Sequence, residues 1–286
     1  MTTLDTPSPV LTTRYQQSVA DYWNEEKDPV NIRLGDVTGT YHHHYGIGAV
    51  DHTALEGPEE TREERVIAEM HRLEIAQADF LLDQLGEVGP DDRILDAGSG
   101  RGGTSFMANL RFGSRGDGIS ISEEQVKFAN QQAEQRGVAD KVAFHFRNML
   151  DNGFPDAAFR SVWNNESTMY VDLYELFAEH ARVLKPGGRY VTITGCFNDV
   201  HGRQPSRAVS QIDAHYICDI HPRSAYFAAM AANNLLPISV VDLTAATIPY
   251  WELRAGSSVA TGIESAFLTA YKEGSFQYLM IAADKV

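Results

Sequence analysis

The sequence predicts an α/β fold: a doubly wound, mostly parallel sheet of seven strands, with helices on both faces and a helical cap in front. Two observations predict it. From about residue 93 onward, short apolar segments alternate with segments of helical periodicity, a pattern typical of βαβ units. The first apolar segment also runs directly into a glycine-rich turn that opens a helix, and open parallel sheets bind ligands at such turns.

The part of the chain before the sheet, residues 1–85, is expected to form the helical cap and a lid. A weak helical pattern covers residues 15–25, and glycines interrupt residues 28–51. Apolar side chains then recur at helical spacing from about 58 to 85, which predicts an amphipathic helix. Residues 86–286 are expected to form the domain that contains the sheet.

Each strand of the sheet is bounded by turn signals. Strands are expected at residues 93–98, 116–121, 142–146, 161–165, 189–195, 238–243 and 276–283. The helices between the early strands are expected to end near residues 111, 136 and 184. The second of these opens at Ser122 with Gln125 three residues later, which is the spacing of a capping box. The last two strands follow longer insertions, and the insertion around residues 198–235 is expected to cover the substrate.

The composition limits the classes of partner. The 286 residues carry 24 Lys and Arg against 39 Asp and Glu, a formal charge of −15. This acidity speaks against duplex binding, because clustered cations hold phosphate backbones, but a small anionic ligand held by local cations or a metal stays open. Two cysteines fit a reducing compartment. No apolar run approaches the roughly 18 residues of a membrane helix, and residues 1–13 lack the apolar core of a signal peptide. We expect a cytoplasmic protein without nucleic-acid or membrane partners, while a homo-oligomer stays open.

The sharpest signal is the turn DAGSGRGG at residues 96–103. Its glycines let the backbone approach a ligand and start a helix whose N–H groups face that ligand. The alternatives are a tight turn without a ligand and the turn of a dinucleotide-dependent oxidoreductase. Such an oxidoreductase places an acidic residue about 20 residues after the glycines. Here Asp96 precedes the glycines and the second strand ends in Gly118-Ile119-Ser120 without an acid, which disfavours the oxidoreductase.

Together with RVLKPGG at residues 182–188, this turn resembles the class I S-adenosylmethionine-dependent methyltransferases over residues 90–197. The resemblance implies that S-adenosylmethionine is the cofactor and that the turn packs against its methionine part. The cofactor-binding residues that it implies in the turn are Asp96, Gly98, Ser99, Gly100 and Gly102.

The segment after the second strand, SISEEQ at residues 120–125, is similar to the pattern of cyclopropane-fatty-acid synthases and sterol C-methyltransferases. In that subgroup a hydroxyl and a glutamine hold the ribose, which implies Ser120 and Gln125. The alternative for Gln125 is the capping role, and both roles can hold together. Asn148 and Met149, after the third strand, occupy the place that grips the adenine in this subgroup. The alternative for Met149 is ordinary core packing.

The end of the fourth strand, WNNESTMY at residues 163–170, supplies candidate catalytic residues. The subgroup methylates carbon: an alkene attacks the sulfonium methyl and leaves a carbocation. This chemistry needs a base, aromatic faces that stabilise the cation and exclusion of water. A carboxylate at the carboxyl end of a central strand faces the ligand crevice, and sterol-type members carry a similar glutamate, so Glu166 is the candidate base. The alternative is that Glu166 caps the next helix or orients a neighbour. Tyr170 is expected close by.

The front segment at residues 31–48 contains three consecutive histidines among tyrosines and glycines. Consecutive side chains diverge, so this run is not an ordinary helical metal pair. One interpretation is a lid that brings Arg33, Tyr41 and His44 to an anionic substrate, as cationic or donor groups and aromatics, with Tyr45 as a stabiliser of the cation. The other is a solvated loop with incidental histidines, and the sequence does not say which histidine faces the site.

The GDVTGTYHHHYGIG stretch at residues 35–48, the glycine-rich turn and the WNNESTMY segment together resemble the bacterial geranyl diphosphate 2-C-methyltransferases over nearly the whole chain. This resemblance implies methylation at C2 of geranyl diphosphate, a cation at C3, and proton loss to give 2-methylgeranyl diphosphate on the terpene route to 2-methylisoborneol. It also implies Mg²⁺ with the diphosphate, a hard cation that needs few dedicated protein ligands; the metal ligands are not assigned. Aromatic residues of the insertion, foremost Phe197 and Tyr216, are expected to wall a prenyl pocket or else to belong to the core.

Three rival functions remain at this point. C-methylation of a sterol or unsaturated lipid uses the same mechanism, but the chain has no basic or apolar surface helix for a bilayer. A nucleotide-cofactor oxidoreductase is disfavoured by the position of Asp96. A non-catalytic cofactor-binding module is mildly disfavoured by Glu166 and the supply of aromatic residues.

Overall fold

One sheet runs through the described residues, which are 9–25, 29–202 and 204–286 of this computed structural model. Its seven strands follow the order β3-β2-β1-β4-β5-β7-β6. The strands are β1 (Arg93–Ala97), β2 (Arg115–Ser120), β3 (Val142–Phe146), β4 (Phe159–Asn165), β5 (Leu184–Phe197), β6 (Leu235–Asp242) and β7 (Phe276–Lys285). β1 to β5 pair in parallel, and β7 runs antiparallel between β5 and β6. The predicted fold class is therefore confirmed.

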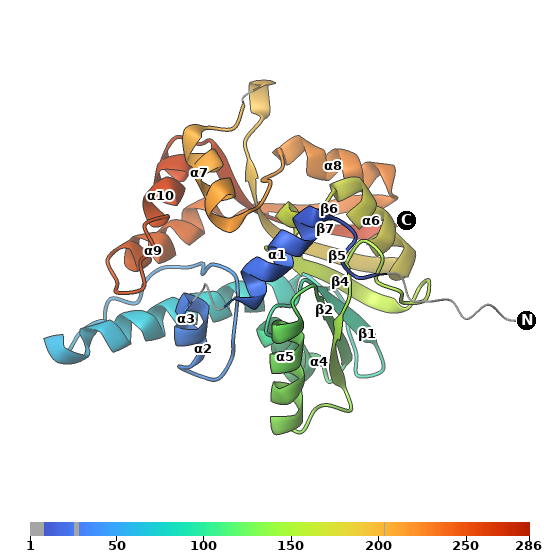
Figure 1. Cartoon of the computed structure of the whole chain (residues 1–286), viewed down its shortest axis with the longest axis horizontal. Helices are drawn as coiled ribbons and strands as arrows, with labels where there is room; N and C mark the ends of the chain where they lie inside the picture. The colour runs from blue at the N-terminus through green and yellow to red at the C-terminus, as the bar shows by residue number, and fades with distance from the viewer. Residues whose placement is uncertain (1–8, 26–28, 203) are drawn as a thin grey trace, which may run out of the picture.

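Helices cover both faces of this sheet (Figure 1). They are α1 (Arg14–Asn24), α2 (Pro29–Gly35), α3 (Arg62–Asp83), α4 (Gly103–Phe112), α5 (Glu123–Gln135), α6 (Leu173–Val183), α7 (Arg207–Tyr216), α8 (Arg223–Ala232), α9 (Thr244–Ala255) and α10 (Glu264–Lys272). Successive strand residues point to opposite faces. Ile94 and Met280 therefore enter a core with α3, α7, α9 and α10, whereas Leu95 and Leu279 enter a second core with α6 and α8. None of the helices in the described part is both long and apolar enough to cross a membrane.

Three segments differ from the expected elements. Residues 28–51 were expected to be irregular but contain α2, and residues 1–8 and 26–28 of the predicted cap lie outside the described residues. β5 begins at Leu184, five residues earlier than expected. β6 begins at Leu235 and includes Pro237, where its register against β7 shifts. An edge strand tolerates this proline, because no neighbour on its outer side needs the missing N–H.

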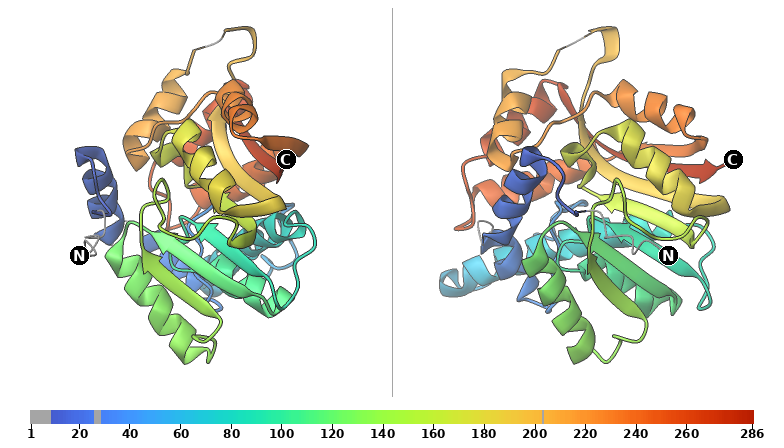
Figure 2. Two further views of the ribbon diagram at one scale, coloured as in Figure 1. Left: turned by 90° about the vertical axis from the view of Figure 1, so that its right-hand side faces the viewer. Right: turned by 45° about the vertical axis from the view of Figure 1, so that its right-hand side comes forward.

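The first helix lies over the ends of the strands. In Figure 1, α1 crosses in front of the sheet between α7 and α5, and the left view of Figure 2 shows it at one side of the molecule. Three hydrogen bonds attach this segment to the sheet domain, one of them from the Tyr15 hydroxyl to Ile217 O (3.0 Å). Asn148 Nδ2 donates to Val10 O (3.1 Å), and Ser122 Oγ donates to Asn24 Oδ1 (2.8 Å). The segment before β1 thus covers the edge at which the parallel strands end.

Candidate active site

The glycine-rich turn between β1 and α4 is folded back against β2. The backbone N–H groups of Gly98 and Ser99 both donate to Ile119 O at 2.9 Å. Gly98 and Gly100 have φ angles of +90° and +53°, which favour glycine. A Cβ at Gly98 would lie 2.5 Å from Ser167 Oγ, and one at Gly100 would lie 2.9 Å from His43 Cδ2. The chain therefore needs glycines here for close packing as well as for the turn.

A cavity, called the loop cavity below, opens beside this turn. Five of the predicted cofactor residues line it: Gly98, Gly100, Ser120, Gln125 and Met149. Ser120 Oγ donates to Gln125 Oε1 (2.9 Å), and Gln125 N donates to Ser122 Oγ at the start of α5 (3.2 Å). Gln125 therefore combines the predicted capping geometry with a place at the cavity wall.

The other four predicted cofactor residues lie around the loop cavity. Asp96 and Ser99 line a smaller adjoining cavity, where Asp96 accepts a hydrogen bond from Ser105 Oγ (2.7 Å). Burial raises the pKa of Asp96 to about 7. Asn148 donates to Val10 O and so binds the α1 segment. Gly102 packs against Phe144, whose Cζ would lie 2.4 Å from a Cβ at this position. In this arrangement, the four residues hold the glycine-rich turn and the α1 segment in place around the loop cavity.

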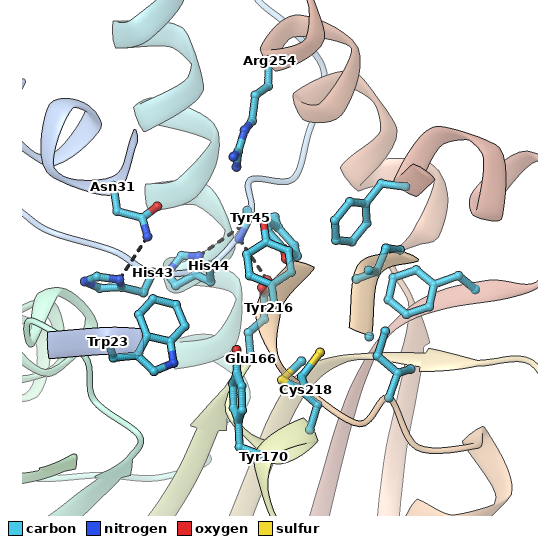
Figure 3. A pocket seen from close by; sticks show the side chains of 16 residues that line it. Trp23, Asn31, His43, His44, Tyr45, Glu166, Tyr170, Tyr216, Cys218 and Arg254 are labelled. Atoms are coloured by element: carbon cyan, nitrogen blue, oxygen red, sulfur yellow. Dashed lines mark hydrogen bonds between the residues drawn. The ribbon is translucent and has the colours of Figure 1, made fainter. Parts of the chain in front are cut away.

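A second cavity, called the inner cavity below, adjoins the loop cavity (Figure 3). Trp23, His43, Glu166 and Tyr170 line both cavities and so form the boundary between them. Beyond this boundary the inner cavity is largely apolar and aromatic; its further lining includes Tyr45, Ile212, Tyr216, Ile220, Phe267 and Phe276. Glu166 is therefore accessible both to a ligand in the loop cavity and to a ligand in the inner cavity.

Glu166 follows the last residue of β4 in a left-handed backbone conformation with φ of +52°. Such a conformation costs about 1–3 kcal/mol and persists where the surrounding structure holds it. Its N–H donates to Ile193 O (2.9 Å), and its Oε1 accepts from Tyr45 N (2.9 Å) and from the hydroxyl of Tyr278. Burial raises the pKa of Glu166 to about 8, although the two hydrogen bonds lower it. A carboxyl group with a strongly raised pKa in a cavity wall is a candidate acid or base.

Tyr45 lies among aromatic rings at the centre of the inner cavity. Its ring centroid is 4.4 Å from that of Trp251, 5.1 Å from that of Phe267 and 6.4 Å from that of Tyr216. Aromatic faces within about 6 Å of a cation attract it through the ring quadrupole. Tyr216, also predicted to line a pocket, is in the cavity wall, and Tyr170 is at the boundary.

His42 and His44 are buried and share one consistent arrangement of protons. His44 Nδ1 lies 3.1 Å from Tyr45 O, a pure acceptor, so this nitrogen carries a proton. His44 Nε2 is then the acceptor for His42 Nδ1 at 3.0 Å. Burial lowers the pKa of His43 to about 3 and that of His44 to about 4. Of the two roles expected for a lid histidine, cationic group or donor, burial favours the donor, because it disfavours the charged form of these rings.

Of the histidines in the run, His43 lines both the loop cavity and the inner cavity. His44 lines the inner cavity but not the loop cavity. The predicted Tyr41 is turned toward Asp36, to which its hydroxyl donates (2.8 Å), and lines the smaller cavity beside Asp96. The predicted Phe197 packs against the core at the end of β5 and is not in the inner cavity wall. Its backbone N–H donates to His221 O (3.1 Å).

The structure places Arg254, rather than the predicted Arg33, in the wall of the inner cavity. Arg33 is exposed and donates to Ser258 Oγ (2.7 Å). Arg254 on α9 is 3% exposed, and its Nε lies 3.0 Å from Glu264 Oε1. Figure 3 shows its guanidinium pointing toward Tyr45 and the cavity. A sequence signal for Arg254 was available. This residue lies four residues after the aromatic Tyr250, and residues i and i+4 share a helix face, so both side chains were candidates for the inner face of α9.

Comparison with known proteins decides the family. A model of the methyltransferase domain matches residues 95–192. The chain is 66% identical over 272 residues to the geranyl diphosphate 2-C-methyltransferase of Saccharopolyspora erythraea, covering 95% of each chain. The chain belongs to the geranyl diphosphate 2-C-methyltransferase family. The relative from Streptomyces coelicolor is 58% identical over 279 residues, covering 97% of this chain and 95% of that protein.

A solved structure from the same family supports the fold along almost the entire chain. It is the geranyl diphosphate C-methyltransferase of Streptomyces coelicolor A3(2) in complex with Mg²⁺, geranyl-S-thiolodiphosphate and S-adenosyl-L-homocysteine. It superimposes with a TM-score of 0.95 at 58% sequence identity, covering 97% of this chain and 100% of that chain. The described fold is therefore that of the geranyl diphosphate 2-C-methyltransferase family.

Proposed function

We propose that the chain transfers a methyl group from S-adenosylmethionine to C2 of geranyl diphosphate and forms 2-methylgeranyl diphosphate. One observation carries this proposal: Glu166 lies at the boundary of two adjoining cavities, one beside the glycine-rich turn and one lined by aromatic residues. The relatives named above act on geranyl diphosphate. A methyl donor in one cavity and a prenyl chain in the other would meet beside the candidate base.

The loop cavity fits S-adenosylmethionine. Gly98 and Gly100 form a cradle that a Cβ would fill, so a ligand can approach the backbone there. Ser120 and Gln125 offer a hydroxyl and an amide to a ribose, and Met149 offers an apolar wall to an adenine. When bound, the cofactor supplies an electrophilic methyl group on a sulfonium.

The cradle gives a direct test. We expect Gly100→Ala to weaken binding of S-adenosylhomocysteine, because the new Cβ would strain a backbone with φ of +53° and press on His43. The strain alone is shared by the free and the bound protein, but the Cβ also displaces His43 from the cavity wall, so the affinity should fall by about tenfold, or about 1.4 kcal/mol. Isothermal titration calorimetry measures it. Gly137→Ala is the matched control, since Gly137 has φ of +68° with nothing within 4 Å of its Cβ. Equal affinities of all three proteins would remove the turn from the cofactor site.

The residues around the boundary can perform the remaining steps. The C2=C3 electrons of the substrate form the new bond to the methyl carbon as its bond to sulfur breaks, which leaves a cation at C3. Tyr45 and its neighbouring rings face this region and would stabilise the cation. Glu166 would then remove the proton from C2, and the C–H electrons would close the C2=C3 bond. Trp23, His43 and Tyr45 all come from residues 1–85, which we propose to act as the cap that excludes water.

Arg254 is the group that we propose for the diphosphate, because it is the cation in the wall of the inner cavity. Overall charge repels a diphosphate from a chain of −15, so a local cation and a metal must supply the attraction. In the described ranges, no group of three or more His, Cys, Asp or Glu is arranged to hold a metal ion. Mg²⁺ is commonly held by substrate phosphates and waters, and we propose that it arrives with the diphosphate.

The proposed function is tested by label transfer. With methyl-labelled S-adenosylmethionine, geranyl diphosphate and Mg²⁺, we expect the label in a prenyl diphosphate, and much less label when EDTA removes the metal. Parallel incubations with farnesyl diphosphate and with a sterol define the substrate class. Transfer to the sterol alone would replace the proposed substrate, and tight binding of NAD in place of S-adenosylhomocysteine would overturn the reaction class.

A further inference from the structure

The carboxylate of Glu166 is held on one side. Both hydrogen bonds that it accepts within the described residues end on Oε1, one from Tyr45 N (2.9 Å) and one from the hydroxyl of Tyr278 on β7. An oxygen with two donors has little basicity left, because each donor favours its charged form. The other oxygen, Oε2, is the one available to a substrate in the adjoining cavities.

The direction of the Tyr278 proton is set by Gln77 on α3. Gln77 Nε2 donates to the Tyr278 oxygen at 2.8 Å. The same amide pairs reciprocally with Asn165: Gln77 Nε2 donates to Asn165 Oδ1 (2.7 Å), and Asn165 Nδ2 donates to Gln77 Oε1 (2.9 Å). In this arrangement the Nε2 end of the Gln77 amide faces the Tyr278 oxygen. Because the tyrosine oxygen accepts from Gln77, its single proton is left for Glu166.

These contacts join three elements far apart in the sequence. Gln77 comes from α3, Asn165 from the end of β4, and Tyr278 from β7. Gln77 and Tyr278 are fully buried, so water does not compete for their hydrogen bonds. Asn165 directly precedes Glu166, whose left-handed backbone turns the carboxylate away from the strand direction. The group therefore restrains Glu166 both through its backbone and through its carboxylate.

We infer that Tyr278, held by Gln77, is a positioning residue that keeps Oε1 of Glu166 turned into the protein, so that Oε2 is the atom that receives the proton from C2 of the substrate. This inference rests on the proposed function. In the step, the C2–H bond breaks, its electrons form the C2=C3 bond and cancel the charge at C3, and the proton ends on Oε2. Tyr278 gives up no proton, and its hydrogen bond to Oε1 persists through the step.

The surrounding charges agree with a fixed donor at Tyr278. Burial and the nearby Glu166 hold the pKa of Tyr278 well above its usual value, so its hydroxyl stays protonated. Glu74 on α3 raises the pKa of Glu166 and Arg254 on α9 lowers it. Titratable groups that line the inner cavity or lie near Glu166 also include Tyr45, Tyr170, Tyr216, Tyr271, Cys218, His43 and His44. Burial raises the pKa values of Tyr45, Tyr170, Tyr271 and Cys218, which stay protonated, and keeps the two histidines neutral.

The test compares Tyr278→Phe with Tyr226→Phe. Tyr226 is equally buried and loses hydrogen bonds to Thr168 and Thr194, but it does not line either cavity. Carbon-13 NMR of protein labelled at the glutamate carboxyl carbons follows the titration of Glu166, with Glu166→Gln identifying its signal. We expect Tyr278→Phe to raise the Glu166 pKa by about one unit, the equivalent of one hydrogen bond to a charged group. Tyr226→Phe should leave it unchanged.

Turnover gives the second readout. For Tyr278→Phe we expect kcat to fall by about tenfold at neutral pH, the acid limb of the pH profile to move upward with the NMR midpoint, and the KM for geranyl diphosphate to change little. Gln77→Met, which removes the amide that orients the Tyr278 proton, should shift the midpoint in the same direction. An unchanged midpoint in Tyr278→Phe, or an equal shift in Tyr226→Phe, overturns the positioning role. Failure of the unmodified protein to methylate geranyl diphosphate would instead contradict the proposed function, while the NMR titration still decides the positioning role.

Discussion

Replacing Glu166 by glutamine is expected to lower kcat by about 100-fold to 10,000-fold, the usual contribution of a general base. The side chain keeps its shape, and Oε1 can still accept from Tyr45 N and the Tyr278 hydroxyl. An amide cannot take the proton from C2, so the cation at C3 would persist. Turnover with labelled S-adenosylmethionine and geranyl diphosphate measures the loss, and calorimetry with S-adenosylhomocysteine should show near-normal binding.

A second buried carboxyl provides the control for this change. Glu74 is fully buried, accepts a hydrogen bond from Tyr250 (3.0 Å) and is outside both cavity walls. Glu74→Gln removes a like charge that raises the Glu166 pKa, so its activity should remain while its acid limb moves to lower pH. Undiminished turnover in Glu166→Gln would exclude Glu166 as the base.

The second large effect is expected at Arg254. Losing a hydrogen-bonded guanidinium should raise the KM for geranyl diphosphate by about 10-fold to 100-fold, the range for hydrogen bonds to charged groups. Simple truncation would leave Glu264 buried and unpaired, since its Oε1 lies 3.0 Å from Arg254 Nε, and such a charge destabilises the fold. The double variant Arg254→Met with Glu264→Gln avoids this problem, and Arg254→Lys retains the charge without the planar guanidinium.

Steady-state kinetics at saturating S-adenosylmethionine resolves the Arg254 effect. The double variant should show the high KM with a largely retained kcat, and Arg254→Lys an intermediate KM, because a lysine cannot reproduce bidentate contacts. Arg33→Met is the control, since Arg33 is exposed and bonded to Ser258. A high KM in Arg33→Met together with a normal KM in the double variant would show that Arg33, and not Arg254, binds the diphosphate.

The sequence predicted those parts of the molecule that depend on short spacings. The alternation of apolar segments specified the parallel sheet, and the spacing of Ser122 and Gln125 specified the helix start. The family resemblance, rather than spacing, pointed to Ser120 and Gln125, which line the loop cavity. Arg254 and Tyr278 were not predicted, because α9 and β7 reach Glu166 only through pairings across the sheet and packing on α3. Arg33 was suggested by its nearness to the histidines along the chain, but its side chain turns to Ser258 on the surface.

The neutral histidines in the cavity walls make the free energy of unfolding depend on pH. In the unfolded chain, His43 and His44 would titrate near the ordinary pKa of about 6.5, whereas burial lowers these values to about 3 and about 4. Between about pH 6.5 and pH 4, His43 and His44 are therefore protonated in the unfolded chain but remain neutral in the folded chain. In that window the free energy of unfolding decreases as the pH is lowered, by up to about 1.4 kcal/mol per pH unit for each such histidine. Above it, both states are neutral and this contribution vanishes. The same burial that places neutral rings in the cavity walls thus makes the folded protein sensitive to mild acid.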